Sequence, residues 1–358
     1  MLYDKVFTGT TVPSIAPSNI PSNDPTTFQS KKPSQNPSKQ ESEHPTAIAT
    51  LFVLYEFYSS TGGINWIDTW DFSSGESWCS FHGITCDDFD QIIKISLEQN
   101  NLEGTIPSEL GMLASLTSLR LHYNYITGTI PSELGALSSL RYVLLQQNPI
   151  TGTIPSELGM LSTMVDLRLH NNRITGTIPS ELGKLSLLRS LYLNSHFISG
   201  TIPSELFTLS SLQNFDLHGN EMSGTISSEL GKLSSLTFLQ LGHNSIFGKI
   251  PSEIGLLSSL SRNLALDSNY ITGSLPSELG LLQSLRSLYV NSNDITGTIP
   301  SELGELISLT TLQINANFIS GSLPSELCAL TETYIFYDEH EISCSCTEST
   351  YIVGTTCS

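Results

Sequence analysis

The chain has 358 residues, and its 15 lysines and arginines against 34 aspartates and glutamates give a formal net charge of −19. An acidic chain of this kind excludes nucleic acid as an expected partner, because the phosphate backbone carries the same sign of charge. No stretch approaches the roughly 20 apolar residues of a membrane span. Contact with a membrane is therefore expected only through a segment absent from this sequence.

Residues 1–45 are expected to form a disordered tail or stalk. They are rich in Pro, Ser, Thr and Asn, and prolines recur every four residues at Pro13, Pro17, Pro21 and Pro25. Such a composition cannot bury a core and favours extended polyproline II conformations. The first residues lack the basic start and apolar run of a signal peptide, so we expect a leader or anchor to precede this sequence in the full-length protein.

Residues 46–91 have the pattern of a folded cap. The stretch 47–58 predicts an amphipathic helix, and the tryptophans at Trp66, Trp70 and Trp78 are expected to pack within the cap. All six cysteines lie near the two ends of the folded region, at Cys79, Cys86, Cys328, Cys344, Cys346 and Cys357. An even number of cysteines at the two ends indicates disulfides and an oxidising, extracellular or cell-surface location.

Residues 92–327 contain one unit repeated ten times. The glycine of its G-x-[IL]-P core recurs every 24 residues, with one interval of 25 between Gly248 and Gly273. A fixed period of this length is typical of a solenoid, in which each coil buries its apolar side against its neighbours. In the unit 116–139, Leu119 and Leu121 alternate with polar residues, which predicts a short strand with the leucines inward.

The rest of the unit predicts a closed coil. Asn124 is expected to turn the chain and to bond backbone groups of adjacent coils through its amide. A second extended segment follows, in which Thr127 and Thr129 point outward, and a proline ends it. Ser132 is expected to cap a short helical turn. The stacked coils should form a parallel sheet on the concave side, with a degenerate eleventh strand at 335–337.

The unit resembles the plant-type leucine-rich repeat, L-x-x-L-x-L-x-x-N-x-L-[ST]-G-x-I-P-x-x-[IL]-G-x-L-x-x, over residues 92–343. The stretches 61–66 and 78–86 are similar to the N-terminal cap of the same family, which implies a disulfide between Cys79 and Cys86. The resemblance implies an α/β fold: a right-handed curved solenoid with short helical turns on its convex side and a cap at each end. Residues 328–358 would be the C-terminal cap, whose four cysteines allow three pairings.

Four departures from the unit are expected to have local effects. His196 replaces the turn asparagine, Ser227 replaces the proline, and Phe247 and Lys249 replace the usual hydroxyl pair. One extra residue lies within 260–264 and should bulge out before the eighth strand.

The function predicted from the sequence is recognition. No nucleophile, nucleotide, zinc-protease or kinase signature is present, so we expect no enzyme activity, no cofactor and no bound metal. The resemblance to receptor ectodomains and polygalacturonase-inhibitor-like proteins implies an extracellular module that binds a protein, peptide or glycan on its concave sheet. We expect this module to be monomeric.

The ligand site predicted on the concave sheet consists of Arg120, His122, Tyr142, Gln146, Arg168, His170, Tyr192, Asp216, His218 and Gln240. Tyr142, Leu144 and Phe238 are expected to add exposed apolar area. Charging of the histidines should strengthen binding as the pH falls through about 6.5.

A second surface supports an alternative function. Thr-Gly-Thr recurs on the outward side of the second extended segment, at Thr127, Thr129, Thr151, Thr153, Thr175, Thr177, Thr296 and Thr298. Two regular rows of hydroxyls and methyls resemble an ice-binding face, so a structural or ice-binding surface protein is the alternative. The plant-type repeat itself favours Ser or Thr before the glycine, which accounts for part of the pattern without any ligand.

Overall fold

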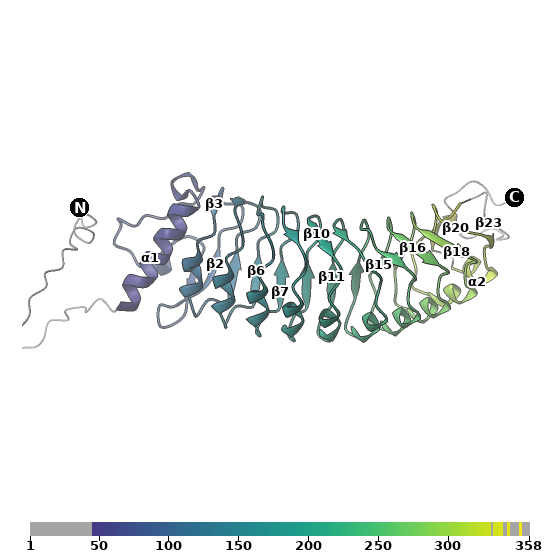
Figure 1. Ribbon diagram of the computed structural model, residues 1–358. Coiled ribbons are helices and arrows are strands. Elements are labelled where there is room, and N and C mark those ends of the chain that lie inside the picture. Colours follow the sequence, from purple (N-terminus) through teal and green to yellow (C-terminus); the bar gives the residue numbers. More distant parts are fainter. Residues whose placement is uncertain (1–44, 331, 339–341, 344–350, 353–358) are drawn as a thin grey trace, which may run out of the picture. The chain divides into compact units, whose positions relative to one another are not determined.

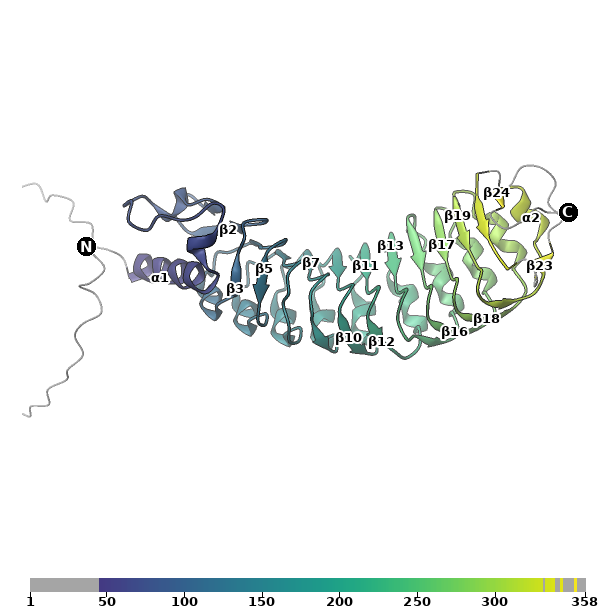
Figure 2. The same cartoon turned by 90° about the horizontal axis from the view of Figure 1, so that it is seen from above.

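The computed structural model describes residues 45–330, 332–338, 342–343 and 351–352. These described residues lie in one compact unit, in which successive repeats stack side by side as coils (Figure 1). The fold is the predicted leucine-rich solenoid: a parallel sheet with short helical turns along another side of the stack. Within this unit the long sheet lies on the inner side of the curve (Figure 2). We call the face formed by its solvent-facing side chains the concave surface.

The long sheet takes one strand from each coil. In spatial order its strands are β1 (Ile84–Cys86), β2 (Ile92–Ser96), β4 (Ser118–Arg120), β6 (Tyr142–Leu144), β7 (Asp166–Arg168), β9 (Ser190–Tyr192), β11 (Asn214–Asp216), β13 (Phe238–Gln240), β15 (Asn263–Ala265), β17 (Ser287–Tyr289), β19 (Thr311–Gln313), β22 (Tyr334–Phe336) and β24 (Tyr351–Ile352). β1 pairs with β2 antiparallel, and the pairs from β2 onward are parallel. Strand β22 confirms the degenerate eleventh strand, shifted by one residue from the expected range.

The second extended segments form shorter parallel ladders on another side of the stack. They are β3 (Glu103–Thr105), β5 (Tyr125–Thr127), β8 (Thr175–Gly176), β10 (Phe197–Gly200), β12 (Glu221–Met222), β14 (Phe247–Gly248), β16 (Tyr270–Gly273), β18 (Asp294–Gly297), β20 (Phe318–Ile319), β21 (Gly321–Ser322) and β23 (Ile342–Ser343). A coil therefore presents two different extended faces.

The helical turns are mostly 3₁₀. They are η4 (Ser108–Met112), η5 (Ser132–Ala136), η6 (Ser156–Met160), η7 (Ser180–Lys184), η8 (Ser204–Thr208), η9 (Ser228–Lys232), η10 (Ser252–Leu256), η11 (Ser277–Leu281), η12 (Ser301–Glu305) and the short α-helix α2 (Ser325–Cys328). The expectation that Ser132 caps its turn was wrong, because Pro131 is the N-cap and Ser132 Oγ donates to Glu133 Oε2 at 3.3 Å. Where serine replaces the proline, Ser227 does cap its turn, accepting from the Glu229 N–H at 3.2 Å.

An asparagine ladder holds neighbouring coils together from inside the turn, as predicted. Asn124 Oδ1 accepts from the N–H groups of Asn100 and Leu102, each at 3.0 Å, and its Nδ2 donates to the carbonyls of Leu97 and Leu121 at 2.8 and 3.0 Å. The same pattern recurs in most coils. Each asparagine thus satisfies backbone groups that would be costly to bury without partners.

His196 interrupts this ladder. The imidazole is only 6% exposed, and within the described residues neither ring nitrogen makes a hydrogen bond. The N–H of Ile174 consequently lacks the side-chain acceptor that Asn172 gives to Ile150 and that Asn220 gives to Ile198. Burial lowers the pKa of His196 to about 4, although the nearby carbonyls of Asn172 and Leu169 favour its charged form.

The N-terminal cap closes the first coil. Its helix α1 (Pro45–Ser60) packs near the turn η2 (Gly63–Asn65), and the turn η3 (Trp78–Ser80) packs near β1. Phe57, Trp66 and Trp70 form an aromatic cluster with centroids 4.9–6.0 Å apart. The disulfide Cys79–Cys86 is present as implied by the resemblance. Cys328 is also disulfide-bonded, whereas Cys344, Cys346 and Cys357 lie outside the described residues.

Among the described helices, none combines the length and the hydrophobicity needed to cross a membrane.

Candidate functional site

Strand register aligns the predicted concave residues in columns. The column at the last position of each strand consists of Arg120, Leu144, Arg168, Tyr192, Asp216 and Gln240, which are paired on successive strands. The column two residues after each strand consists of His122, Gln146, His170, Asn194 and His218. The backbone carbonyls of these residues accept hydrogen bonds from N–H groups of the preceding coil. Tyr142 belongs to the column at the first strand position. We call the ten residues predicted from the sequence the concave patch.

Arg168 has a fixed position on this patch. Its Nε and Nη2 donate to the carboxylate of Asp166 at 2.8–3.0 Å, and its guanidinium carbon lies 5.2 Å from the centre of the Tyr192 ring. Arg120 is held more weakly. Its Nε donates to Ser118 Oγ at 3.2 Å, and its guanidinium carbon lies 5.9 Å from the centre of the Tyr142 ring. Asp166 was not among the predicted residues, although an aspartate two positions before an arginine on the same strand face is a usable signal.

The histidines of the patch are not poised to charge near pH 6.5, which corrects the sequence-based expectation. Burial lowers the pKa of His170 to about 4, helped by the Arg168 charge. Burial also lowers the pKa of His122, with Arg120 and Arg168 adding to the effect and Glu98 opposing it. For His218 burial is again the main cause of a lowered pKa, followed by His243. His170 is therefore a neutral hydrogen-bonding group at pH 6.5, and the pKa values of His122 and His218 are shifted in the same direction.

Asp216 is a buried carboxylate in the middle of the patch. Its side chain is 7% exposed, and its Oδ1 accepts from the His218 N–H at 3.0 Å. No basic side chain of the described residues lies within ion-pair distance of it. Burial raises the pKa of Asp216 to about 6, and the bond from His218 only partly opposes this effect.

The extra residue before β15 places Arg262 across the concave surface. Its guanidinium carbon lies 4.7 Å from the centre of the Phe238 ring, and Nη1 donates to Asn214 Oδ1 two coils back at 3.2 Å. Phe238 is consequently only 9% exposed. The expectation that Phe238 adds exposed apolar area was therefore wrong. Leu144 is half-buried and exposes only part of its side chain. The irregular 25-residue interval was the signal that could have pointed to Arg262.

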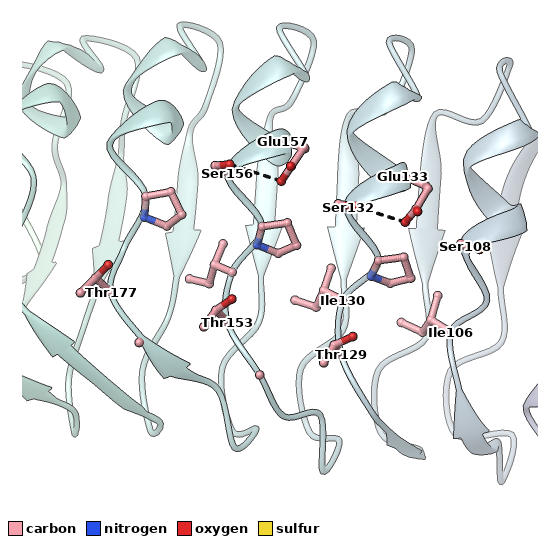
Figure 3. A pocket seen from close by; sticks show the side chains of 16 residues that line it. Ile106, Ser108, Thr129, Ile130, Ser132, Glu133, Thr153, Ser156, Glu157 and Thr177 are labelled. Carbon is pink, nitrogen blue, oxygen red and sulfur yellow. Dashed lines mark hydrogen bonds between the residues drawn. The ribbon is translucent and has the colours of Figure 1, made fainter.

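The threonine face lies on a different side of the stack, and its two rows differ. The first row, with Thr127, Thr151 and Thr175, donates its hydroxyls to glycine carbonyls of the preceding coil at 2.8–3.2 Å. The second row of threonines, represented by Thr129, Thr153 and Thr177, lines an open depression of about 970 Å³ (Figure 3). The second-row hydroxyls make no hydrogen bond within the part of the chain that the structure describes.

The second row also has a packing role. Gly152 has a positive φ of 79°, and a Cβ on it would lie 2.6 Å from Thr129 Cγ2. The threonine methyl of one coil therefore covers the glycine of the next, which explains the Thr-Gly-Thr pattern in part without a ligand.

Comparison with known proteins agrees with this geometry. The family described as leucine-rich repeat region matches residues 124–246, and the leucine-rich repeat family matches residues 284–306 and 308–330. A stretch of 69 residues is 39% identical to a probable leucine-rich-repeat receptor-like serine/threonine-protein kinase of Arabidopsis thaliana, and covers 19% of this chain and 9% of that one. The chain is a leucine-rich-repeat protein.

Solved leucine-rich-repeat structures resemble it closely. The ectodomain of the receptor kinase GASSHO1/SCHENGEN3 from Arabidopsis thaliana, in complex with CASPARIAN STRIP INTEGRITY FACTOR 2, matches with a TM-score of 0.73 and 35% identity over 76% of this chain and 33% of that chain. The Arabidopsis receptor kinase HAESA, with the peptide hormone IDA and the co-receptor SERK1, matches with a TM-score of 0.67 and 27% identity over 83% and 54%. This leucine-rich-repeat protein thus spans a third to a half of those chains.

A plant ice-binding protein shares the fold as well. It matches with a TM-score of 0.70 and 23% identity, over 83% of this chain and 97% of that chain. At this identity the similarity concerns the solenoid fold alone.

Proposed function

We propose that this leucine-rich-repeat protein is an extracellular, non-enzymatic recognition module that binds an extended peptide, or a peptide segment of a protein, on the concave patch. The observation that carries the proposal is that one column of the concave patch holds two side chains of opposite charge, two strands apart. Arg168 is oriented by Asp166 and Tyr192, and Asp216 is a carboxylate without a counterion two strands away. Fixed, partly desolvated charges of this kind select partners more than they stabilise a fold.

The strand geometry favours an extended ligand. Neighbouring strands are about 4.8 Å apart, so Arg168 and Asp216 lie roughly 10 Å from each other along the column. The similarity to the receptor kinase HAESA, whose structure is of a complex with the peptide hormone IDA, supports a peptide as the ligand class. The similarity to the ectodomain of the membrane receptor kinase GASSHO1/SCHENGEN3 and the Cys79–Cys86 disulfide support an extracellular location.

The test is selection of ligands from a random decapeptide phage library on the full-length protein. We expect enriched peptides whose affinity falls at least tenfold with Arg168→Glu. Arg173→Glu is the matched control, because Arg173 is exposed and lies outside the concave patch, and it should change affinity less than twofold. Failure to enrich any peptide above blank support, or equal binding by Arg168→Glu, would overturn the proposal.

The second row of the threonine face favours one further candidate function, ice binding. Thr129, Thr153, Thr177, Thr201 and Thr225 repeat in five successive coils and are exposed. Their free hydroxyls and methyls form a regular array, which Lys249 interrupts in the next coil. Wild-type protein at micromolar concentration should then show thermal hysteresis that Thr153→Lys with Thr177→Lys removes. Absence of any effect of wild-type protein on ice growth would leave only the concave patch.

A further inference from the structure

We propose that Asp216 is the recognition point for a basic side chain of the peptide ligand, a lysine ammonium or an arginine guanidinium. The inference rests on the proposed peptide-binding function of the concave patch, and it goes beyond that function by naming which chemical group the ligand must carry and which residue receives it.

The first argument is the electrostatic state of Asp216. Asp216 is only 7% exposed, so its carboxylate loses much of its hydration, and a buried charge is costly unless an opposite charge is near. Within the described residues its polar contact is the bond that Oδ1 accepts from the His218 N–H. A neutral amide group could accept this bond equally well, so the local fold does not require the charge.

The second argument comes from the other carboxylates along the concave surface. Asp166 is paired with Arg168 at 2.8 Å, and Asp267 lies 3.2 Å from His243 Nε2. Glu98 accepts from Ser96 Oγ at 2.9 Å. These three acids are therefore already satisfied by neighbours in this chain. Asp216 is more buried than all three, and unlike Asp166 and Asp267 it has no ion-pair partner among the described residues.

The third argument is the surroundings of Asp216 on the sheet. Tyr192 and Gln240 are its register neighbours on β9 and β13. The Tyr192 ring already carries the Arg168 guanidinium at 5.2 Å, whereas the amide oxygen of Gln240 can accept a second hydrogen bond from a cation that binds Asp216. The chain's own Arg262 reaches the same strand at Asn214, but its guanidinium is taken up by Asn214 and Phe238.

The experiment uses the library described above on wild-type protein, on Asp216→Asn and on the control Asp267→Asn. Asparagine keeps the acceptor for the His218 N–H and removes only the charge, so the fold should be unchanged, which circular dichroism checks. We expect a lysine or arginine at one fixed position of the peptides selected on wild-type protein and on Asp267→Asn. That preference should disappear on Asp216→Asn.

A double-mutant cycle then tests direct contact. The strongest selected peptide is compared with a neutral analogue, in which citrulline replaces arginine or norleucine replaces lysine, on wild-type protein and on Asp216→Asn. We expect the neutral analogue to bind wild-type protein at least tenfold more weakly and to bind Asp216→Asn within twofold of the parent peptide. Peptides that depend on Arg168 but carry no basic residue, or additive effects in the cycle, would overturn the inference and leave peptide binding intact. A library that yields no peptide would overturn both proposals.

Discussion

Arg262 lies over the ring of Phe238, with 4.7 Å between the guanidinium carbon and the ring centre. The contact exists because one extra residue shifts the chain before β15, so that Leu239 pairs with Leu264 while Phe238 and Asn263 do not pair. Nη1 of the same guanidinium donates to Asn214 Oδ1. Arg262, positioned by the inserted residue, thus links three coils across the concave surface.

Replacing Arg262 with alanine should destabilise the fold by about 1 kcal/mol, because a cation–π contact and one hydrogen bond are lost and Phe238 becomes exposed. Urea unfolding followed by circular dichroism measures the change. Arg286→Ala is the matched control one coil later, where the exposed guanidinium has no ring contact within the described residues, and it should cost less than about 0.5 kcal/mol. Equal losses for the two variants would contradict the stabilising role of Arg262.

Changing His196 to asparagine should stabilise the protein by roughly 1–2 kcal/mol, because the N–H of Ile174 regains a side-chain acceptor. The measurement is the urea midpoint at pH 7.5. His122→Asn is the control, since His122 lies on the concave surface outside the ladder and its replacement adds no such acceptor. A destabilised His196→Asn variant would show that the imidazole fills space that asparagine cannot.

The pH dependence of stability tests the same residue. A histidine whose folded pKa is about 4 contributes stability that is present above its unfolded pKa near 6.5 and is lost as the pH falls through about 4. Between pH 7 and pH 4 the stability of His196→Asn should therefore fall less than that of wild type. Parallel pH profiles of the two proteins would contradict burial of a neutral imidazole at this position.

Asp216→Asn should stabilise the unliganded protein above pH 6 and leave it unchanged near pH 4. The folded pKa of about 6 lies above the unfolded value, so the stability linked to Asp216 is fully present below the unfolded pKa and is lost as the pH rises through about 6. A shift of about two pH units corresponds to a gain of up to about 3 kcal/mol at pH 7. Asp267→Asn should show no such gain, because Asp267 faces His243. A loss of stability in Asp216→Asn at pH 7 would count against an uncompensated charge.

The two rows of the threonine face should respond differently to the same substitution. Thr151→Val removes the hydroxyl that donates to the Gly128 carbonyl at 3.0 Å, and should cost about 1 kcal/mol. Thr153→Val keeps the methyl over the next glycine and removes a hydroxyl without a protein partner, and should cost less than about 0.5 kcal/mol. Thermal unfolding of the two variants provides the comparison, and a reversed order would contradict the assignment of the rows.

Removal of the Cys79–Cys86 disulfide by a double serine substitution should cost about 2.5 kcal/mol, because it frees a short closed loop in the unfolded chain. Trp66, Trp70 and Trp78 all lie in this cap, so tryptophan fluorescence reports its unfolding. Circular dichroism should show that the central coils keep their structure at denaturant concentrations where the fluorescence has already changed. Simultaneous loss of both signals would indicate that the cap and the array unfold together.

The sequence by itself determined the repeat architecture, because each coil repeats one local pattern with a fixed period. Leu119 and Leu121 point inward and Asn124 bonds to the neighbouring coils as the unit predicted. These features depend on alternation, on turn chemistry and on the contacts between adjacent identical units. The columns of the concave patch follow from the same period, since one register relates the neighbouring strands from β4 to β13.

Only the tertiary structure decided how the side chains of the patch are satisfied. Burial, which depends on neighbours 24 or 48 residues away, keeps His170 neutral and leaves Asp216 without a counterion. The same packing covers Phe238 with Arg262 and takes up the hydroxyl of Thr151. Charge state and hydrogen bonding depend on distances between coils, and a repeat pattern specifies which residues face outward without specifying which of them already have a partner.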